Sequence, residues 1–406
     1  MTRTGRIARL LLATFMSTSA LAAPPHIARR PFATGLRWFP AAPLPAVNSA
    51  AVNTKSPSAH SSNAPYGFPP EQYTIVDVPG AGTAYGQGTN LVAVNSSSAS
   101  SGFYVDVNNY SHGFMRAADG AITTFDADGP TSQTDAWGIN NRGEIAGEFV
   151  DPDSGLFKDY LRSGDGTMEL FDGSEAGTGS DVERINNQGA IVGEYDDVNG
   201  AFHGYVRARN GTITQFDAPG AGTGYLQGTE AFDINRAGII SGPYTDTNNV
   251  YHGYLRAADG TFTEIDVPGA GAGPNQGTIA NVINNNGWVD GTYIDANDVL
   301  HGFLRAPHGT ITTFDAPDSG TGFQQGTFAV DLTNNGKIVG WYQDANGVYH
   351  GFERSRKGCI VEFDAPGAGT GAGLGTEAFY VARHNMISGW EQDNGGVYHG
   401  YLRTPQ

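Results

Sequence analysis

Short runs of alternating apolar and polar residues, separated by turn residues, recur along the chain after residue 70. The pattern is clearest from Gly228 to Pro268, where four such runs stand between junctions rich in Asn, Asp and Gly. Runs of this length with a period of two predict β-strands, and Asn and Gly at the junctions favour tight hairpins. Each unit therefore predicts four short strands that form one small antiparallel meander.

The third predicted strand of each unit carries the motif His-Gly-aromatic-x-Arg. Its histidines and arginines are His112, His203, His252, His301, His350 and His399, and Arg116, Arg162, Arg207, Arg256, Arg305, Arg354 and Arg403. The copy that ends at Arg162 is degenerate, with Lys158 and Asp159 in place of His-Gly. The arginines lie 45 to 49 residues apart. Self-similarity at this period is typical of solenoids and propellers.

The two ends of the repeat region favour a propeller over an open solenoid. Each complete unit ends in an apolar residue followed by Asp, and an orphan copy of this pair, Val76-Asp77, stands at the start of the domain. The last unit stops after its third strand, near Arg403. We expect the orphan strand, about Tyr73 to Val78, to complete the C-terminal sheet. This predicts an all-β fold, a closed seven-bladed propeller of four-stranded antiparallel blades.

These units resemble the bacterial extracellular repeats of the HAF family, named after His-Ala-Phe, with Gly in place of Ala here. The resemblance extends from about residue 73 to the end of the chain. It implies an exported repeat protein with no defined activity. No catalytic residue transfers, because the family pattern consists only of the repeated residues.

The repeated polar residues are interpreted as structural. An Arg on a strand between blades needs a partner, and the Asp that ends the fourth strand is the best candidate. A two-residue turn would pair Asp266 with Gly253, whereas a three-residue turn with a bulge at Gly260 would pair it with His252. We favour the second register, because it gives both His252 and Arg256 a partner. A ring of metal-binding or catalytic histidines is the alternative.

The first 22 residues have the character of a secretory signal peptide, with scattered arginines, an apolar stretch and small residues before the expected cleavage point. Residues 23–70 are rich in Pro, Ala and Ser and are expected to form a flexible leader. Residues 71–406 form the predicted propeller. No later stretch approaches the length of a transmembrane helix. We therefore expect a secreted or periplasmic protein.

Charge and composition narrow the partners. The formal net charge of −18 makes nucleic acid a poor partner. The lone Cys359 excludes an internal disulfide. The glycine-rich connections lack the Gly-Lys-Ser/Thr of a phosphate loop, and the Asp-x-Asn-x junctions fit hairpin turns better than calcium loops. We expect no cofactor and no metal.

The connections between blades predict where a ligand would bind. They emerge on the same face as the turns between second and third strands, and such loops vary freely on a rigid scaffold. From the fourth-strand Asp to the next inner-strand aliphatic residue is 17 residues in most units, but only 13 from Asp126 to Ile139 and from Asp172 to Ile185. This predicts a notch in the loops at the second and third blades.

The candidate ligand-binding residues lie in this notch and around the rim. Those in the notch are Trp137, Asp135, Asp181 and Glu183, and those on the rim are Tyr85, Gln87, Tyr225, Gln227, Gln276, Phe323 and Gln325. Acidic groups beside a Trp suit a sugar polymer or a cationic ligand, and aromatic and amide side chains are compatible with carbohydrate. The alternative is that the rim residues pack the loops on one another.

Sequence alone favours a non-catalytic protein that binds a glycan or another extracellular or surface partner through the loop face. The alternative is a polysaccharide hydrolase or lyase that uses Asp181, Glu183 and Arg184 in the notch. A structural surface protein with no small ligand is a third possibility. Binding is favoured because the chain has no Gly-x-Ser-x-Gly, His-Glu-x-x-His or paired Cys and His.

Overall fold

The computed structural model describes residues 71–174 and 178–405. The predicted signal peptide (1–22) and leader (23–70) lie outside these residues. The regular secondary structure of the described part of the chain consists of β-strands and one 3-10 turn, η1 (Arg383–Asn385). No helix among the described residues is long and apolar enough to cross a membrane.

The strand pairings form four-stranded antiparallel sheets. The first sheets along the chain are β2 (Gly88–Val94), β3 (Ser100–Val105), β4 (Ser111–Arg116) and β5 (Ile122–Phe125), then β6 (Asp135–Ile139), β7 (Ile145–Val150), β8 (Phe157–Arg162) and β9 (Met168–Phe171), and then β10 (Ser180–Ile185), β11 (Ile191–Asp196), β12 (Phe202–Arg207) and β13 (Ile213–Phe216). The next sheets are β14 (Gly228–Thr229) and β15 (Asp233–Ile234) with β16 (Ile240–Thr245), β17 (Tyr251–Arg256) and β18 (Phe262–Ile265), then β19 (Gly277–Ile283), β20 (Val289–Ile294), β21 (Leu300–Arg305) and β22 (Ile311–Phe314), and then β23 (Gly326–Leu332), β24 (Ile338–Gln343), β25 (Tyr349–Arg354) and β26 (Ile360–Phe363). The remaining strands are β27 (Gly375–Val381), β28 (Ile387–Gln392), β29 (Tyr398–Pro405) and β1 (Glu71–Val76).

The predicted pairing between the ends of the repeat region is confirmed. β1 runs antiparallel to β29, with Val76 opposite Gly400, and so adds a fourth strand to the β27–β29 sheet. The predicted four strands between Gly228 and Pro268 are also present, with the first of them split into β14 and β15.

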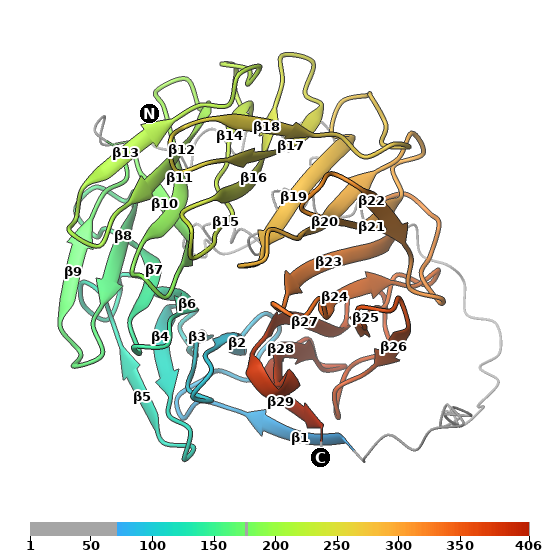
Figure 1. Ribbon diagram of the computed structural model, residues 1–406. Coiled ribbons are helices and arrows are strands. Elements are labelled where there is room, and N and C mark those ends of the chain that lie inside the picture. The colour runs from blue at the N-terminus through green and yellow to red at the C-terminus, as the bar shows by residue number, and fades with distance from the viewer. Residues whose placement is uncertain (1–70, 175–177, 406) are drawn as a thin grey trace, which may run out of the picture. The chain divides into compact units, whose positions relative to one another are not determined.

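Figure 1 shows these sheets side by side around a common centre, with the first strand of each unit nearest the centre and the fourth strand outermost. One-residue parallel bridges join third strands to the first strand of the following sheet, as between Tyr251 and Gly277. Gly277 has a φ of 121°, and a Cβ there would lie 2.0 Å from the Tyr251 carbonyl oxygen, so only glycine fits. The same bridge joins Tyr398 of β29 to Gly88 of β2.

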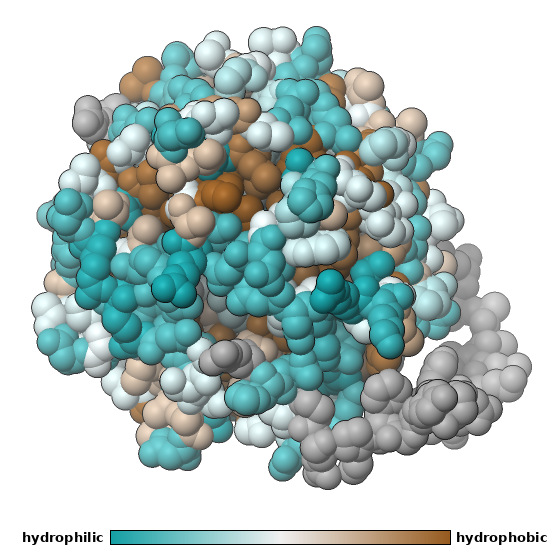
Figure 2. All heavy atoms as spheres, viewed as in Figure 1, coloured by the Kyte–Doolittle hydropathy of each residue, from teal (hydrophilic) through white to brown (hydrophobic). Residues whose placement is uncertain are grey.

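The hydrophobic core lies between neighbouring sheets. One cluster joins Val339 of β24 to Ala378 and Tyr401 of the last sheet. Another joins Leu402 of the last sheet to Leu91 of the first. In the view of Figure 2, hydrophilic residues cover most of the surface, and hydrophobic residues gather over β11, β12 and β16. Each sheet thus buries apolar side chains against both of its neighbours, as in stacked repeat units.

The His of the repeated motif pairs with the Asp after the fourth strand of its own sheet. Gly253 is opposite Ile265, which places Asp266 beside His252. His252 Nδ1 lies 3.0 Å from Asp266 Oδ1, and the five other His–Asp pairs have distances of 2.7 to 2.9 Å. The favoured register is therefore confirmed.

The Arg of the motif has a different partner from the one expected. In five of the seven copies the guanidinium lies over the fourth-strand Phe of the preceding sheet, as Arg256 does 4.6 Å from the centre of the Phe216 ring. Arg162, Arg207, Arg354 and Arg403 do the same. Where such an Arg has a carboxylate partner, it is a Glu, as in the ion pairs of Arg207 with Glu169 and of Arg403 with Glu353. The expectation of one Asp shared by His and Arg was wrong, because the flat guanidinium finds a ring in the next sheet within reach.

The other motif positions serve the same packing. The Gly leaves room for the Phe of its own fourth strand, since a Cβ on Gly351 would lie 2.6 Å from the Phe363 ring. The aromatic residue is fully buried and meets the Phe of the preceding sheet edge to face, as Tyr401 meets Phe363. The motif therefore ties each sheet internally through His and to its neighbour through the aromatic residue and Arg.

Candidate functional site

Hydrogen bonds confirm that the connections between sheets and the turns between second and third strands share one face. In the first of these connections, Gln87 Nε2 donates to Asn109 Oδ1 and to the Val107 carbonyl, both in the β3–β4 turn. Its Oε1 accepts from Ala84 N of its own loop. Gln227, Gln276 and Gln325 likewise accept from an N–H of their own loops. These amides hold the loops, as the packing alternative describes, and their contact with a ligand stays a prediction.

The aromatic residues predicted for the rim are at the surface. Tyr85, Tyr225 and Phe323 are 77, 55 and 70% exposed. Tyr85 and Tyr225 also lie over Gly396 and Gly200 in the adjoining turns, where a Cβ would come within 2.1 and 2.6 Å of their rings. Their outer faces are available for stacking against a ligand.

The predicted notch falls at the β5–β6 and β9–β10 connections, and a row of carboxyl groups crosses the sheet between them. Asp135 of β6 is opposite Glu148 of β7, and Glu148 is opposite Asp159 of β8. Residues directly opposite on antiparallel strands point to the same face, so these side chains stand side by side. Asp159 replaces the Gly of the repeated motif.

Asp159 lies at the buried end of this row. It is fully buried, and its Oδ2 accepts hydrogen bonds from Ser180 Oγ at 2.6 Å and from the Tyr205 hydroxyl at 2.8 Å. Burial holds the pKa of Asp159 well above its usual range, with nearby Asp181 and Asp172 adding to the effect. Both hydrogen-bond donors belong to the following sheet, so the row faces that sheet.

Glu183 of β10 comes from the opposite side of this interface. Glu183 occupies the bulge of β10, and Trp137 occupies the equivalent bulge of β6. Trp137 packs edge-on against Phe103, with ring centres 5.5 Å apart. Phe103 occupies in β3 the place of Glu148 in β7, so the equivalence places Glu183 beside Glu148.

A second carboxyl pair continues the cluster in the next sheet, where Asp181 is opposite Glu194. Both are buried, whereas Asp135 and Glu183 are partly exposed. We define the acidic notch as the following six residues: Asp135, Glu148, Asp159, Asp181, Glu183 and Glu194. Such a concentration of carboxyl groups creates a strongly negative potential that favours a cationic group.

Arg184 was expected to act with Asp181 and Glu183, but its side chain points to a different set of residues. The Nε atom lies 3.5 Å from Asp233 Oδ1, and Nη2 lies 3.7 Å from Asp331 Oδ1. The guanidinium also lies over the Tyr380 ring at 4.9 Å. The expected catalytic set is therefore divided, because these inner-strand carboxylates hold Arg184 away from the acidic notch.

Sequence reasoning missed Glu148 and Asp159. Asp159 carried a signal, since it stands where every other copy of the motif has Gly. No sequence signal marked Glu148, because the equivalent positions of other sheets hold residues as different as Phe103, Pro243 and Trp341. Only the strand register shows that both belong to one row with Asp135.

No protein-family model matches the sequence, and no curated protein matches it. Solved structures share the fold at low identity. A catalytically inactive virginiamycin B lyase from Staphylococcus aureus, determined with quinupristin, has 14% identity and a TM-score of 0.53 over 83% of this chain and 100% of the other. The BP39L lectin from Burkholderia pseudomallei has 11% identity and a TM-score of 0.51 over 77% and 96%.

A fungal lectin from Aleuria aurantia, described as a six-bladed β-propeller, has 13% identity and a TM-score of 0.42 over 67% of this chain and 92% of the lectin. The radial sheets of Figure 1 and the fold shared with the virginiamycin B lyase and the BP39L lectin define an all-β propeller.

Proposed function

We propose that the protein is an exported HAF-type repeat protein, a closed seven-bladed propeller that binds a glycan or another extracellular partner through its loop face, without catalysis. Closure is supported by the bridge between Tyr398 and Gly88 and by the core that joins Leu402 to Leu91. The proposed blade count is supported by the grouping of the strands into four-stranded units. The proposal that nucleic acid is not a partner is supported by the formal net charge of −18.

The observation that carries the binding proposal is the acidic notch. At the positions of Glu148 and Asp159 another sheet carries Trp341 and Gly351, so a sheet of this kind forms without these two carboxyl groups. Trp137, predicted for the notch, instead packs against Phe103 of the preceding sheet and so lies on the other side of the β6–β9 sheet from the carboxyl row. The ligand best matched to the carboxyl groups is a glycan with protonated amino groups, because charge-assisted hydrogen bonds to carboxylates are strong and directional.

Calorimetric titration with oligomers of glucosamine and of N-acetylglucosamine tests the proposal. We expect saturable binding of the amino form that weakens with added salt. Glu183→Gln and Asp135→Asn should each weaken it about tenfold, as expected for a lost hydrogen bond to a charged group. Asp259→Asn removes an equal charge from an exposed turn of another sheet and should leave affinity unchanged. Absence of saturable binding to either oligomer would refute glycan binding by this site.

A polysaccharide hydrolase or lyase is the second candidate. It is favoured by the unequal carboxyl groups of the notch, since the pKa of Asp159 is raised by burial whereas Asp135 and Glu183 reach the surface. Release of new reducing or unsaturated ends from a polysaccharide would support catalysis. Turnover that survives the double change Asp181→Ala and Glu183→Ala would exclude the notch as the catalytic centre.

A further inference from the structure

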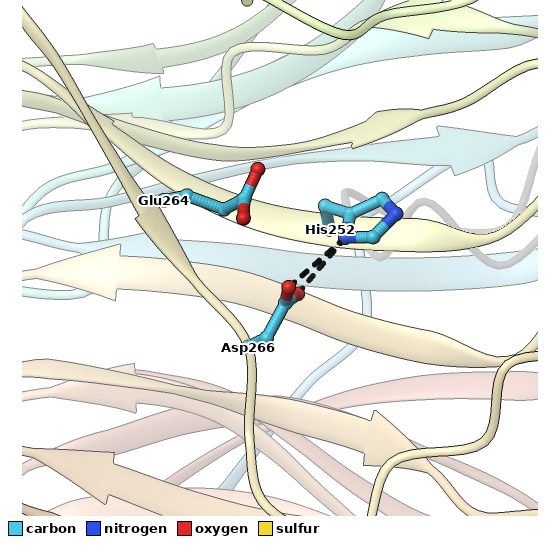
Figure 3. A group of neighbouring side chains, drawn as sticks. All are labelled: His252, Glu264 and Asp266. Carbon is cyan, nitrogen blue, oxygen red and sulfur yellow. Dashed lines mark hydrogen bonds and ion pairs between the residues drawn. The ribbon is translucent and has the colours of Figure 1, made fainter.

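A second group of potential ligands lies outside the acidic notch, on the sheet that contains β16, β17 and β18. His252 of β17, Glu264 of β18 and Asp266 directly after β18 each offer one atom to a common point, and these atoms lie within 4.8 Å of one another. Figure 3 shows the carboxyl groups of Glu264 and Asp266 pointing toward the imidazole of His252. From these residues we propose a binding site for a divalent transition-metal ion, best matched by Zn²⁺.

The neighbouring structure holds the three ligands in place. Asp266 approaches His252 Nδ1 with both oxygens, at 3.0 and 3.2 Å. The Tyr244 ring stacks on the imidazole with centres 4.9 Å apart, and its hydroxyl donates to Glu264 Oε2. Two ligands of one tetrahedral Zn²⁺ are separated by roughly 3.3–3.6 Å, given metal–ligand bonds of ~2.0–2.2 Å. The His–Asp spacing is therefore close to what the ion requires.

The ligand chemistry selects the ion. One imidazole and two carboxylates suit Zn²⁺, whereas Ca²⁺ and Mg²⁺ take oxygen ligands almost exclusively. The ion would replace the proton between His252 and Asp266 and bridge all three groups. Three protein ligands leave a fourth position for water or for a donor atom from another molecule.

The scaffold does not require Glu264, because other sheets keep the His–Asp pair without it. In the next sheet Thr313 occupies this position, while Tyr293 stacks on His301 at 4.8 Å and His301 pairs with Asp315 at 2.8 Å. A third sheet carries Glu362 here, but that carboxylate accepts from Asp318 N at 3.0 Å and so is engaged with the neighbouring loop. Among the described residues, only the group at His252 brings all three ligands together.

The difference between these sheets provides the test. Titration of the untagged full chain with ZnCl₂, followed by calorimetry and by metal analysis after dialysis, should show one bound Zn²⁺ per chain. Glu264→Thr copies the neighbouring sheet and should weaken binding at least about tenfold, as expected when a coordinating group is lost. Thr313→Glu should create a second equivalent of bound Zn²⁺ beside His301.

Each result decides the proposal. Failure of the wild-type chain to retain Zn²⁺, or full affinity in Glu264→Thr, overturns the site. If Thr313→Glu binds no second equivalent of Zn²⁺, a carboxylate at this position does not complete the metal site. Equal competition by Ca²⁺ would show a site of oxygen ligands without His252. Circular dichroism of both variants checks folding, which we expect to be unchanged because each new residue occurs at an equivalent position.

Discussion

The same row of strand positions holds carboxyl groups in one sheet and aromatic rings in another. In the β6–β9 sheet the row is Asp135, Glu148 and Asp159, whereas in the β23–β26 sheet it is Phe328, Trp341 and Gly351. Phe328 and Trp341 stack with ring centres 4.9 Å apart and an interplanar angle of 8°. The register is the same, although the chemistry is opposite. Residues outside the row must therefore fix the register, which leaves the row free to acquire a function.

The same two sheets also differ in the ion pair that the first motif residue of the third strand forms. In the β23–β26 sheet His350 pairs with Asp364 after the fourth strand. In the β6–β9 sheet Lys158 replaces the His and forms an ion pair with Asp151 in the turn before its strand. The hydrogen bond from Lys158 lowers the pKa of Asp151 to about 2. The third strand is thus held through the turn, and Asp172 after the fourth strand instead accepts hydrogen bonds from Ser174 N and Ser180 Oγ.

The largest expected effect is at Arg184, where the inner strands meet. Arg184→Ala removes the cation between Asp233 and Asp331 and should lower the free energy of unfolding by about 3–5 kcal/mol near pH 7. Burial raises the pKa of Asp331 to about 6 and that of Asp233 also upward, with Arg184 opposing the rise. The loss measured by urea unfolding should therefore shrink at pH 4.

Adding Asp233→Asn and Asp331→Asn to Arg184→Ala should restore much of the lost stability, because the buried charges are then gone. Equal stability of Arg184→Ala and wild type would contradict the proposed role of this network. It would also remove the reason why Arg184 does not belong to the acidic notch.

A second prediction concerns Asp159, the residue that distinguishes the acidic row most clearly. A carboxyl group whose folded pKa is raised favours folding in its protonated form, so its contribution is fully present below the unfolded pKa of about 3.9 and is lost as pH rises toward the folded value. Asp159→Asn should therefore stabilise the protein at pH 8 by about 1–3 kcal/mol. The gain should disappear at pH 3. Thermal unfolding at several pH values measures it, and exposed Asp119→Asn provides the control.

A third prediction tests the packing that keeps all sheets in the same register. Phe216→Leu removes the ring under Arg256 and should lower the free energy of unfolding by about 1 kcal/mol or somewhat more. The reciprocal change is Ile265→Phe, because the fourth strand of that sheet offers Arg305 no ring. It should gain about 0.5 kcal/mol. If Phe216→Leu has no effect in chemical unfolding, the Arg–Phe contact is not what joins the sheets.

The repeat made most of the fold predictable, because each unit shows the same alternation and the same turn residues. The pairing of the N-terminal strand with the last sheet followed from counting strands, and the His252–Asp266 pair followed from hairpin length. The Arg partner could not be predicted, since Phe216 and Arg256 belong to different sheets and only tertiary packing brings them together. Asp135 was identified as a candidate, but its neighbour Glu148 depends on strand register, which composition does not reveal.

The smallest expected effect distinguishes the His–Asp pair of most sheets from the Lys158–Asp151 pair by the pH dependence of the stability that each contributes. The hydrogen bond with Asp315 raises the pKa of His301, so this pair stabilises the fold below the unfolded His pKa of about 6.5, and the contribution is lost as pH rises through the folded value. Asp315 is half-exposed, so solvent screening limits the contribution to about 0.5 kcal/mol. Asp315→Asn should therefore be less stable than wild type at pH 5.5 and nearly equal to it at pH 9. Lys158 keeps its charge over this whole range, so the loss of stability caused by Asp151→Asn should stay constant. If the loss of stability varied with pH in the same way for Asp151→Asn and Asp315→Asn, the Lys158–Asp151 and His301–Asp315 pairs would not differ in their pH response.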